Sequence, residues 1–314
     1  MSLAIAHSAE EWAAHFGKSR KPAAVAIGNF DGLHLGHQAI LGGVLKRARE
    51  AGWLAAVLTL YPHPPRVLQP AKAPLLLSSL SQRLAGFEAM GLDAALVVEF
   101  NHDLSKLSPE EFAQKFLAET MRAKAVFVGE NFRFGHKQSG DVKLLGELGK
   151  KLGFEACIVA PVKVNGEIVS STTVRQAVSE GRMDAAARLL GRPYSIAGEI
   201  HAGTGQGRKL VVPTLNIATE QELLPKKGVY VTETLLGGRR FPSVTNVGVR
   251  PTFDGAGLSI ESHLLDFNEA ITAGKMEIRF LARLRDEQKF ASVEALKKQV
   301  LEDIDTARRH FTRV

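Results

Sequence analysis

The chain has 314 residues, of which 45% are hydrophobic, so it is long enough for two globular domains with substantial cores. Lysine and arginine number 40 against 33 aspartate and glutamate, a formal net charge of +7, but the basic residues are scattered and only 7% of residues are aromatic. This favours small anionic ligands and argues against nucleic acid as a partner. No apolar run is as long as a membrane span and no secretory leader is evident, so we expect a soluble cytoplasmic protein without a membrane partner.

Up to about residue 180, short β-like runs alternate with longer helical runs, which is typical of a doubly wound parallel sheet. The expected strands are Ala23–Ile27, Ala55–Leu60, Ala94–Val98, Ala125–Val128 and Ala156–Ala160. We expect the last of these to be buried and its cysteine, Cys157, to be a small core residue rather than a nucleophile. Ligands of such sheets bind beyond the carboxyl ends of strands, which points to the segments Gly28–His37 and Gly129–Phe134.

The segment after the first strand has the pattern of a phosphate-binding loop. It reads Gly28-Asn29-Phe30-Asp31-Gly32-Leu33-His34-Leu35-Gly36-His37 and precedes an amphipathic helix that Gly52 ends. A helix beginning near His34 places both imidazoles on one face, and Gly36 allows a ligand to approach the backbone. Two histidines on a helix can be a surface pair, but this context favours a site for a nucleoside triphosphate. Attack of a phosphate oxygen on the α-phosphorus needs no protein base, so His34 and His37 would stabilise charge on the phosphates.

Two further loops can contribute to the same chemistry. Ser170–Arg175 offers hydroxyls and a guanidinium before a helix and predicts a second phosphate clamp; the alternative is an ordinary N-cap with a solvated arginine. The exposed polar and aromatic loop Gly129–Gly135 suits a ring or a ribose, or is a plain loop with two anchoring phenylalanines.

The pattern changes after Tyr194. Short β-rich runs, such as Gly228–Thr234 and Ser259–Leu265, alternate with Gly and Pro turns, which predicts a small antiparallel barrel. The stretch from Ser292 has the periodicity of an amphipathic helix that packs on this barrel. Gly203-x-Gly205-x-x-Arg208 lacks a third glycine and a following helix, so it is not a dinucleotide fingerprint; it lets a nucleotide lie against the barrel, or forms a β-turn.

Together these motifs resemble the bacterial bifunctional riboflavin kinase/FMN adenylyltransferase family, also called FAD synthetase, over nearly the whole chain. The first half carries the resemblance in Gly28–Gly32, His34–His37, Pro62–Pro64, Gly129–Gly135, Ser139–Asp141 and Ser170–Arg175. The resemblance implies an α/β, Rossmann-like adenylyltransferase domain over residues 1–186 and a β-barrel kinase domain with a terminal helix over 187–314. It implies nucleotide contacts from Gly28, Asn29, Phe30, Asp31, Gly36, Asn131, Ser171, Thr172 and Arg175 beside the catalytic His34 and His37.

The second half resembles the flavokinase part of that family. Its motifs are Leu189–Tyr194, Gly203–Arg208, Pro213–Asn216, Gly248–Phe253 and Glu261–Phe267. The resemblance implies that Thr214 and Asn216 hold Mg²⁺ and an ATP phosphate, and that Glu261 deprotonates the riboflavin hydroxyl. It also implies that Gly203 and Gly207 contact the nucleotide. This is sound chemistry, because an alcohol is a poor nucleophile until a base accepts its proton, and a hard cation prefers oxygen ligands.

Two departures from the family pattern stand out. The family's Leu-Gly-Phe-Pro-Thr-Ala-Asn is Leu-Val-Val-Pro-Thr-Leu-Asn here, with Val211 for glycine and Val212 for the aromatic residue. These changes could reshape the nucleotide loop or slow the kinase, although Thr214 and Asn216 are retained and activity is expected. Tyr61 stands where the family often has an acidic residue.

We therefore expect a bifunctional enzyme that makes FMN from riboflavin and FAD from FMN. ATP is its co-substrate, and the only protein partner we allow for is a second copy in a weak homo-oligomer. One alternative is the same scaffold with only the adenylyltransferase half active. The other is a non-catalytic flavin- or RNA-binding regulator, which would not require His34, His37 and Glu261.

Overall fold

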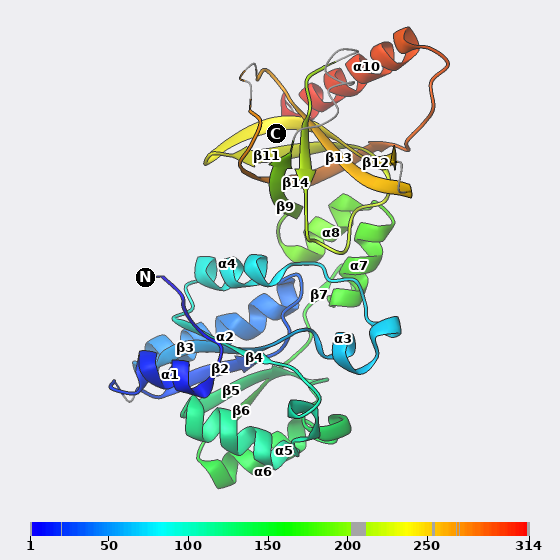
Figure 1. Cartoon of the computed structure of the whole chain (residues 1–314). Coiled ribbons are helices and arrows are strands. Elements are labelled where there is room, and N and C mark those ends of the chain that lie inside the picture. Colours follow the sequence, from blue (N-terminus) through cyan, green and yellow to red (C-terminus); the bar gives the residue numbers. More distant parts are fainter. Residues whose placement is uncertain are drawn as a thin grey trace. The chain divides into compact units, whose positions relative to one another are not determined.

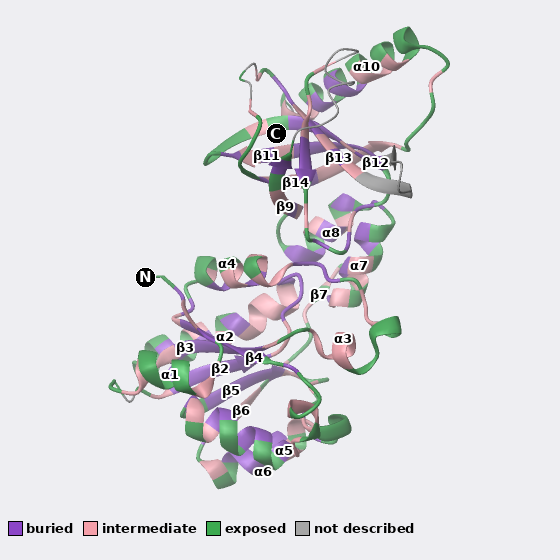
Figure 2. Ribbon diagram, in the orientation of Figure 1, coloured by how far each residue is buried: buried purple, intermediate pink, exposed green. Residues whose placement is uncertain are grey.

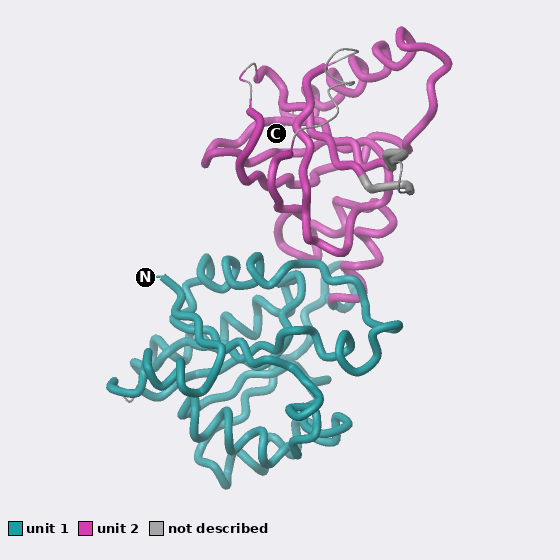
Figure 3. The backbone as a smooth tube through the Cα atoms, in the orientation of Figure 1, with its two compact units in different colours: residues 1–170 teal, residues 171–314 magenta. Residues whose placement is uncertain are grey.

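The computed structural model describes residues 2–19, 21–201, 212–252, 255–267, 269 and 271–312. It divides into two compact units, residues 1–170 and 171–314, which we call the sheet unit and the barrel unit (Figure 3). This division falls after Ser170, so it groups the following helices with the barrel. The functional boundary after residue 186 stays a prediction. Among the described residues, no helix combines the length and apolar character needed to cross a bilayer.

The sheet unit contains a parallel six-stranded sheet in the order β1-β4-β3-β2-β5-β6 (Figure 1). Its strands are β1 (Ala4–Ala6), β2 (Ala23–Ile27), β3 (Leu54–Tyr61), β4 (Ala94–Glu99), β5 (Ala123–Gly129) and β6 (Glu155–Val159). The five predicted strands are confirmed, and β1 is an additional strand, because three residues are too few to show a periodic pattern. The expectation that the last strand is buried is wrong: β6 pairs only with β5, and Ile158 is exposed.

Helices cover both faces of this sheet. They are α1 (Ala9–Phe16), α2 (Leu35–Ala51), α3 (Pro64–Leu68), α4 (Leu80–Met90), α5 (Pro109–Phe112), the π-helical η3 (Ala113–Thr120) and α6 (Val142–Leu152). Short 3₁₀ turns η1 (Pro70–Lys72), η2 (Leu104–Lys106) and η4 (His136–Gln138) and the hairpin β7 (Lys163–Val164) and β8 (Glu167–Ile168) complete the unit. Alternate residues of β2 enter two cores: Val25 packs with α1, α5 and α6, whereas Ala24 packs with α2 and α4.

The barrel unit is a closed antiparallel barrel in the order β10-β13-β12-β11-β14-β9. Its strands are β9 (Tyr194–His201), β10 (Leu215–Ala218), β11 (Gly228–Leu236), β12 (Arg239–Thr252), β13 (Gly255–Leu264) and β14 (Lys275–Arg285). Helices α7 (Ser171–Ser179) and α8 (Met183–Leu190) precede it and α10 (Val293–Thr312) follows it. Ile304 and Ala307 of α10 pack on the outer face of β11, so the predicted barrel and terminal helix are confirmed.

The strands of the barrel carry many buried residues (Figure 2). Hydroxyl-bearing side chains are among them and fill part of the barrel interior. The barrel hydroxyl cluster consists of Thr232, Thr234, Ser243, Thr245 and Ser262, all fully buried and joined by hydrogen bonds of 2.7–3.0 Å. Each of these polar groups has a partner, so their burial is compatible with a stable core. Because successive side chains of a strand point to opposite faces, an inward Ser262 turns Glu261 and His263 to the outer face.

Replacing Thr232 with valine keeps the side-chain shape but removes the hydroxyl that bonds to both Ser243 and Thr245. We expect the free energy of unfolding of the barrel unit to fall by about 1–2 kcal/mol, because buried hydroxyls lose a partner. Urea unfolding followed by circular dichroism measures this change. The exposed Thr306→Val on α10 is the matched control and should stay within about 0.5 kcal/mol of wild type. An equally small change in Thr232→Val would contradict the stabilising role of the cluster.

Candidate active sites

The strand order of the sheet unit reverses direction at its centre, between β2 and β5. From β2 the chain proceeds through β3 to β4 on one side, whereas β5 and β6 lie on the other side. Since β2 and β5 are parallel neighbours, the segments that follow Ile27 and Gly129 leave the same edge of the sheet side by side. Ligands of open α/β sheets bind at such a switch point, so the predicted placement of both loops is confirmed.

A buried carboxylate holds the loop that follows β2. Asp31 is 3% exposed and accepts hydrogen bonds from the backbone N–H groups of Leu77 at 3.1 Å and Ser78 at 3.0 Å. The Ser78 hydroxyl in turn accepts from the N–H of Gly32 at 2.9 Å. The sequence predicted a nucleotide contact for Asp31; the structure shows that its two oxygens fix the loop to residues 77–78.

The two predicted histidines lie against each other at the start of α2. His34 is the N-cap rather than a helical residue, and its Nδ1 accepts a hydrogen bond from the backbone N–H of His37 at 3.3 Å. The rings are stacked, with centroids 3.6 Å apart and an interplanar angle of 20°. A Cβ at Gly36 would lie 3.2 Å from the His34 ring, so this glycine leaves room for the imidazole. The predicted proximity of the two imidazoles is confirmed.

Other predicted loop residues support this pair. The buried Phe30 ring meets His37 edge-on, at 5.3 Å between centroids, and a Cβ at Gly28 would lie 3.2 Å from Phe30. The main-chain oxygen of Asn29 accepts a hydrogen bond from Arg83 of α4 at 2.7 Å. Asn131 is exposed beyond the end of β5.

The predicted phosphate clamp begins α7. Ser171 starts this helix, Thr172 is exposed and Arg175 is half-buried on the next turn. These residues belong to the barrel unit by the contact division, and their place beside the histidines stays a prediction.

In the barrel unit, strand register brings the predicted kinase residues together. Glu261 of β13 lies opposite Asn216 of β10 on one side and Asn246 of β12 on the other. Its Oε2 accepts a hydrogen bond from the Thr214 hydroxyl at 3.3 Å, and its Oε1 accepts one from Ser259 at 3.0 Å. Thr214, Asn216 and Glu261 therefore form one cluster of oxygen-bearing groups, as predicted.

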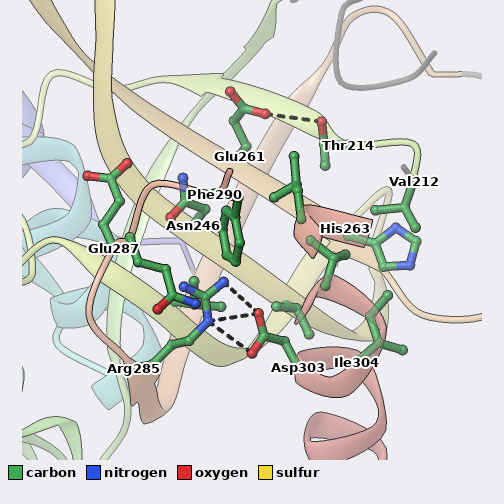
Figure 4. Close-up of a pocket in the computed structure, with 15 residues that line it drawn as sticks. Val212, Thr214, Asn246, Glu261, His263, Arg285, Glu287, Phe290, Asp303 and Ile304 are labelled. Atoms are coloured by element: carbon green, nitrogen blue, oxygen red, sulfur yellow. Dashed lines mark hydrogen bonds and ion pairs between the residues drawn. The ribbon is translucent and has the colours of Figure 1, made fainter. Parts of the chain in front are cut away.

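Thr214 and Glu261 of this cluster stand at one end of a cavity of about 400 Å³ between the barrel and α10 (Figure 4). Apolar side chains line its middle, among them Val212, Val244, Phe290 and Ile304. At the other end, Arg285 of β14 pairs with Asp303 of α10 (Figure 4). The cavity thus combines an apolar body with the Glu261 carboxylate at one end and the Arg285–Asp303 ion pair at the other, which suits a flat ring that carries a reactive polar chain.

Comparison with known proteins matches each half of the chain separately. A family model described as FAD synthetase matches residues 17–173, and one described as riboflavin kinase matches residues 190–311. The bifunctional riboflavin kinase/FMN adenylyltransferase of Pseudomonas fluorescens is 39% identical over 90% of this chain and 91% of its own length. The chain belongs to this family. The protein of the same description from Escherichia coli K12 is 35% identical over 91% of this chain and 92% of its own.

A solved structure described as a macrolide-efflux protein from Streptococcus pneumoniae shares the fold of this family member. It covers 98% of this chain and 99% of its own, with a TM-score of 0.86 and 26% identity. The activity in that description belongs to that protein.

Some residues of the cavity between the barrel and α10 were not predicted from the sequence. Arg285 Nη2 donates to Asp303 Oδ2 at 2.8 Å, its Nε contacts both carboxylate oxygens at 3.1 Å, and its guanidinium lies 5.7 Å from the Phe290 ring centroid. His263 Nδ1 lies 2.8 Å from the carbonyl oxygen of Pro213 and ties β13 to the segment before Thr214. The sequence did contain one signal, because Asp303 interrupts the apolar stripe of α10 and is 5% exposed.

Three other sequence-based interpretations have different outcomes. Gly203, Gly207 and Val211 lie outside the described residues. Val212 lines the cavity between the barrel and α10 and packs against the barrel core with its apolar side chain. Cys157 is half-buried, and burial raises the pKa of its thiol above the ordinary value, so little of it is the nucleophilic thiolate at neutral pH.

Proposed function

We propose that this chain converts riboflavin to FAD in two ATP-dependent steps at two sites. The barrel unit phosphorylates riboflavin to FMN and releases ADP, and the sheet unit adenylylates FMN and releases pyrophosphate. One observation supports this above all. A single chain that belongs to the bifunctional family carries both the stacked His34–His37 pair at a helix N-terminus and the Glu261 cluster at an apolar cavity.

In the adenylyl transfer, the FMN phosphate is already ionised and attacks the α-phosphorus without a protein base. The bond from the α-phosphorus to the bridging oxygen breaks as pyrophosphate leaves. Since His34 Nδ1 accepts from the His37 backbone, a neutral His34 ring carries its proton on Nε2, which is then a hydrogen-bond donor. The two imidazoles and the N-terminus of α2 stabilise the negative charge that develops on the phosphates.

In the kinase step, Glu261 accepts the proton of the riboflavin hydroxyl while the hydroxyl oxygen attacks the γ-phosphorus of ATP. The bond from the γ-phosphorus to the β,γ-bridging oxygen breaks as ADP leaves. The Thr214 and Ser259 hydroxyls orient the carboxylate from both sides. The isoalloxazine ring occupies the apolar part of the cavity, between the barrel and α10. In this proposed binding mode, the reactive alcohol of the flavin lies at the Glu261 end of the cavity.

A divalent cation fits the residues of the kinase site. Among the described residues, no three or more His, Cys, Asp or Glu side chains group as a metal site. Thr214 and Asn216 instead offer neutral oxygens beside the Glu261 carboxylate, which suits Mg²⁺ held mainly by nucleotide phosphates and water. These two residues would hold the ion, which neutralises phosphate charge when bound.

The proposal also includes features that rest on the sequence motifs and on the resemblance. These are the domain limits 1–186 and 187–314, the direct nucleotide contacts of the loop residues Gly28, Asn29, Phe30, Asp31 and Gly36, and those of Asn131, Ser171, Thr172, Arg175, Gly203 and Gly207. A cytoplasmic location is part of it, since both steps consume ATP.

Incubation of the full chain with riboflavin and Mg-ATP, followed by chromatography, tests the proposed function. FMN and FAD should both form from riboflavin. Formation of FAD only when FMN is supplied would contradict the kinase assignment, and failure to form FAD from FMN would contradict the adenylyltransferase assignment.

His37→Ala should lower the rate of FAD formation from FMN by about 100-fold or more, because it removes a group that stabilises charge in the transition state. FMN formation from riboflavin in the same preparation should stay near wild type. His102→Ala, which changes an exposed histidine of the sheet unit, is the matched control. Equal loss of both activities in His37→Ala would argue against separate sites.

Glu261→Gln should have the reverse effect. It preserves an oxygen that can accept from Thr214 or Ser259 but cannot take the alcohol proton, so FMN formation should fall by about 100-fold or more. Adenylylation of supplied FMN should continue at the wild-type rate. Glu220→Gln changes an exposed glutamate of the barrel unit and serves as the control. An undiminished kinase rate in Glu261→Gln would remove Glu261 as the base.

A further inference from the structure

A buried arginine contacts the loop Gly28–His37, which precedes and begins α2. It was not among the residues predicted for the adenylyltransferase site. Arg83 of α4 is 1% exposed, and its Nη1 donates to the main-chain oxygen of Asn29 at 2.7 Å. Its Nε and Nη2 are buried and have no hydrogen-bond partner among the described residues. The guanidinium therefore makes one hydrogen bond to the loop, and the free energy lost when it leaves water is only partly offset. Packing alone does not favour such an arrangement.

The surroundings of Arg83 are consistent with a large desolvation penalty for its guanidinium. Arg83 and Phe87 are one turn apart on the buried face of α4, and Phe87 contacts the ring of Phe30 edge-on, at 5.7 Å between centroids. Burial lowers the pKa of Arg83 from its ordinary value, and the negative charge of Asp31 opposes this shift. Because a guanidinium does not deprotonate in proteins, Arg83 carries a positive charge into the buried face of α4, within the electrostatic field of the Asp31 carboxylate.

The loop needs such support because its backbone is strained. Phe30 has φ 50°, Gly32 φ 81° and Leu33 φ 44°, so two residues with large side chains occupy the left-handed region. Arg83 fixes the carbonyl of Asn29 on one side of Phe30, and residues 77–78 fix Asp31 on the other. Hydrogen bonds to other segments therefore hold the residues directly before and after Phe30, the first left-handed residue of the loop.

The strained loop leads directly to the histidines. Leu33 is followed by His34, the N-cap whose Nδ1 receives the His37 N–H, and the Phe30 ring lies against His37. A shift of Asn29 and Phe30 therefore changes the position of both imidazoles. We propose that Arg83 is a positioning residue for adenylyl transfer, which holds the Asn29 carbonyl and so keeps His34 and His37 aligned on the nucleotide phosphates. This inference rests on the function proposed for that loop.

Three variants of the full chain separate positioning from packing. Arg83→Met keeps the length of the side chain but removes charge and donor, Arg83→Gln keeps a donor without charge, and Arg83→Lys keeps both. Arg47→Met is the matched control, since Arg47 lies on α2 with its side chain exposed and pairs with Glu155. The kinase activity of each preparation, measured as FMN formation, reports on the rest of the chain.

Arg83→Met should lower kcat for FAD formation from FMN by about 100-fold with little change in KM for ATP, because misaligned groups lose interactions made only in the transition state. The kcat of Arg83→Gln should be close to that of Arg83→Met, whereas Arg83→Lys should recover a large part of the lost kcat. FMN formation and the thermal unfolding of Arg83→Lys should match wild type. Arg47→Met should form FAD at the wild-type kcat.

Wild-type kcat for FAD in a folded Arg83→Met or Arg83→Gln would overturn the proposal, as would a loss confined to KM. If neither variant shows a normal unfolding transition, Arg83→Lys decides. A kcat for FAD formation within about tenfold of wild type at unchanged KM then supports positioning by the retained donor, and a kcat lowered by more than that, or a loss confined to KM, overturns it. Failure of the wild-type chain to make FAD from FMN contradicts the proposed function itself, so the two failures are distinguishable.

Discussion

Both sites depend on the alternation of side chains along a β-strand. In β2 both faces are covered by helices, so Ala24 and Val25 enter different cores and the strand has no free face for polar chemistry. The reactive groups of the sheet unit therefore follow the strand, in the loop before α2. In β13 only one face looks into the barrel, where Ser262 is buried, and Glu261 stands on the other face beside the cavity. Side-chain alternation thus places the site of the sheet unit at strand ends and the site of the barrel unit on the outer face of a strand.

In each unit a buried charge fixes the element that carries the site. Asp31 and Arg83 hold the loop before His34, while Arg285 and Asp303 connect β14 to the helix that closes the kinase cavity. Buried ionic groups contribute little net stability because desolvation offsets their attraction. They do restrict geometry strongly, because any conformation that separates the partners leaves a buried charge without compensation. We infer that these groups are used here to define positions that phosphate chemistry requires.

The sequence was most informative where chemistry and local pattern coincide. The apolar run Ala23–Ile27 predicted β2 to the residue. The His-x-Gly-His spacing predicted that the two imidazoles share one face, and the structure shows them stacked. Thr214, Asn216 and Glu261 are distant in sequence, and the resemblance identified them before the barrel register brought them together. Local pattern did not reveal the barrel hydroxyl cluster, because polar residues at alternate positions usually indicate a solvent face. Nor did it reveal Arg83, because the proposed positioning role depends on a hydrogen bond to a residue 54 positions earlier in the chain.

The central claim is that two separate sites act in sequence on one flavin. A mixture of His37→Ala and Glu261→Gln, supplied with riboflavin and Mg-ATP, tests it most directly. Each variant alone should form no appreciable FAD, whereas the mixture should, because FMN made by the His37→Ala chain is adenylylated by the Glu261→Gln chain. FAD formed at the wild-type rate by either variant alone, or a mixture that accumulates FMN without FAD, would contradict the account.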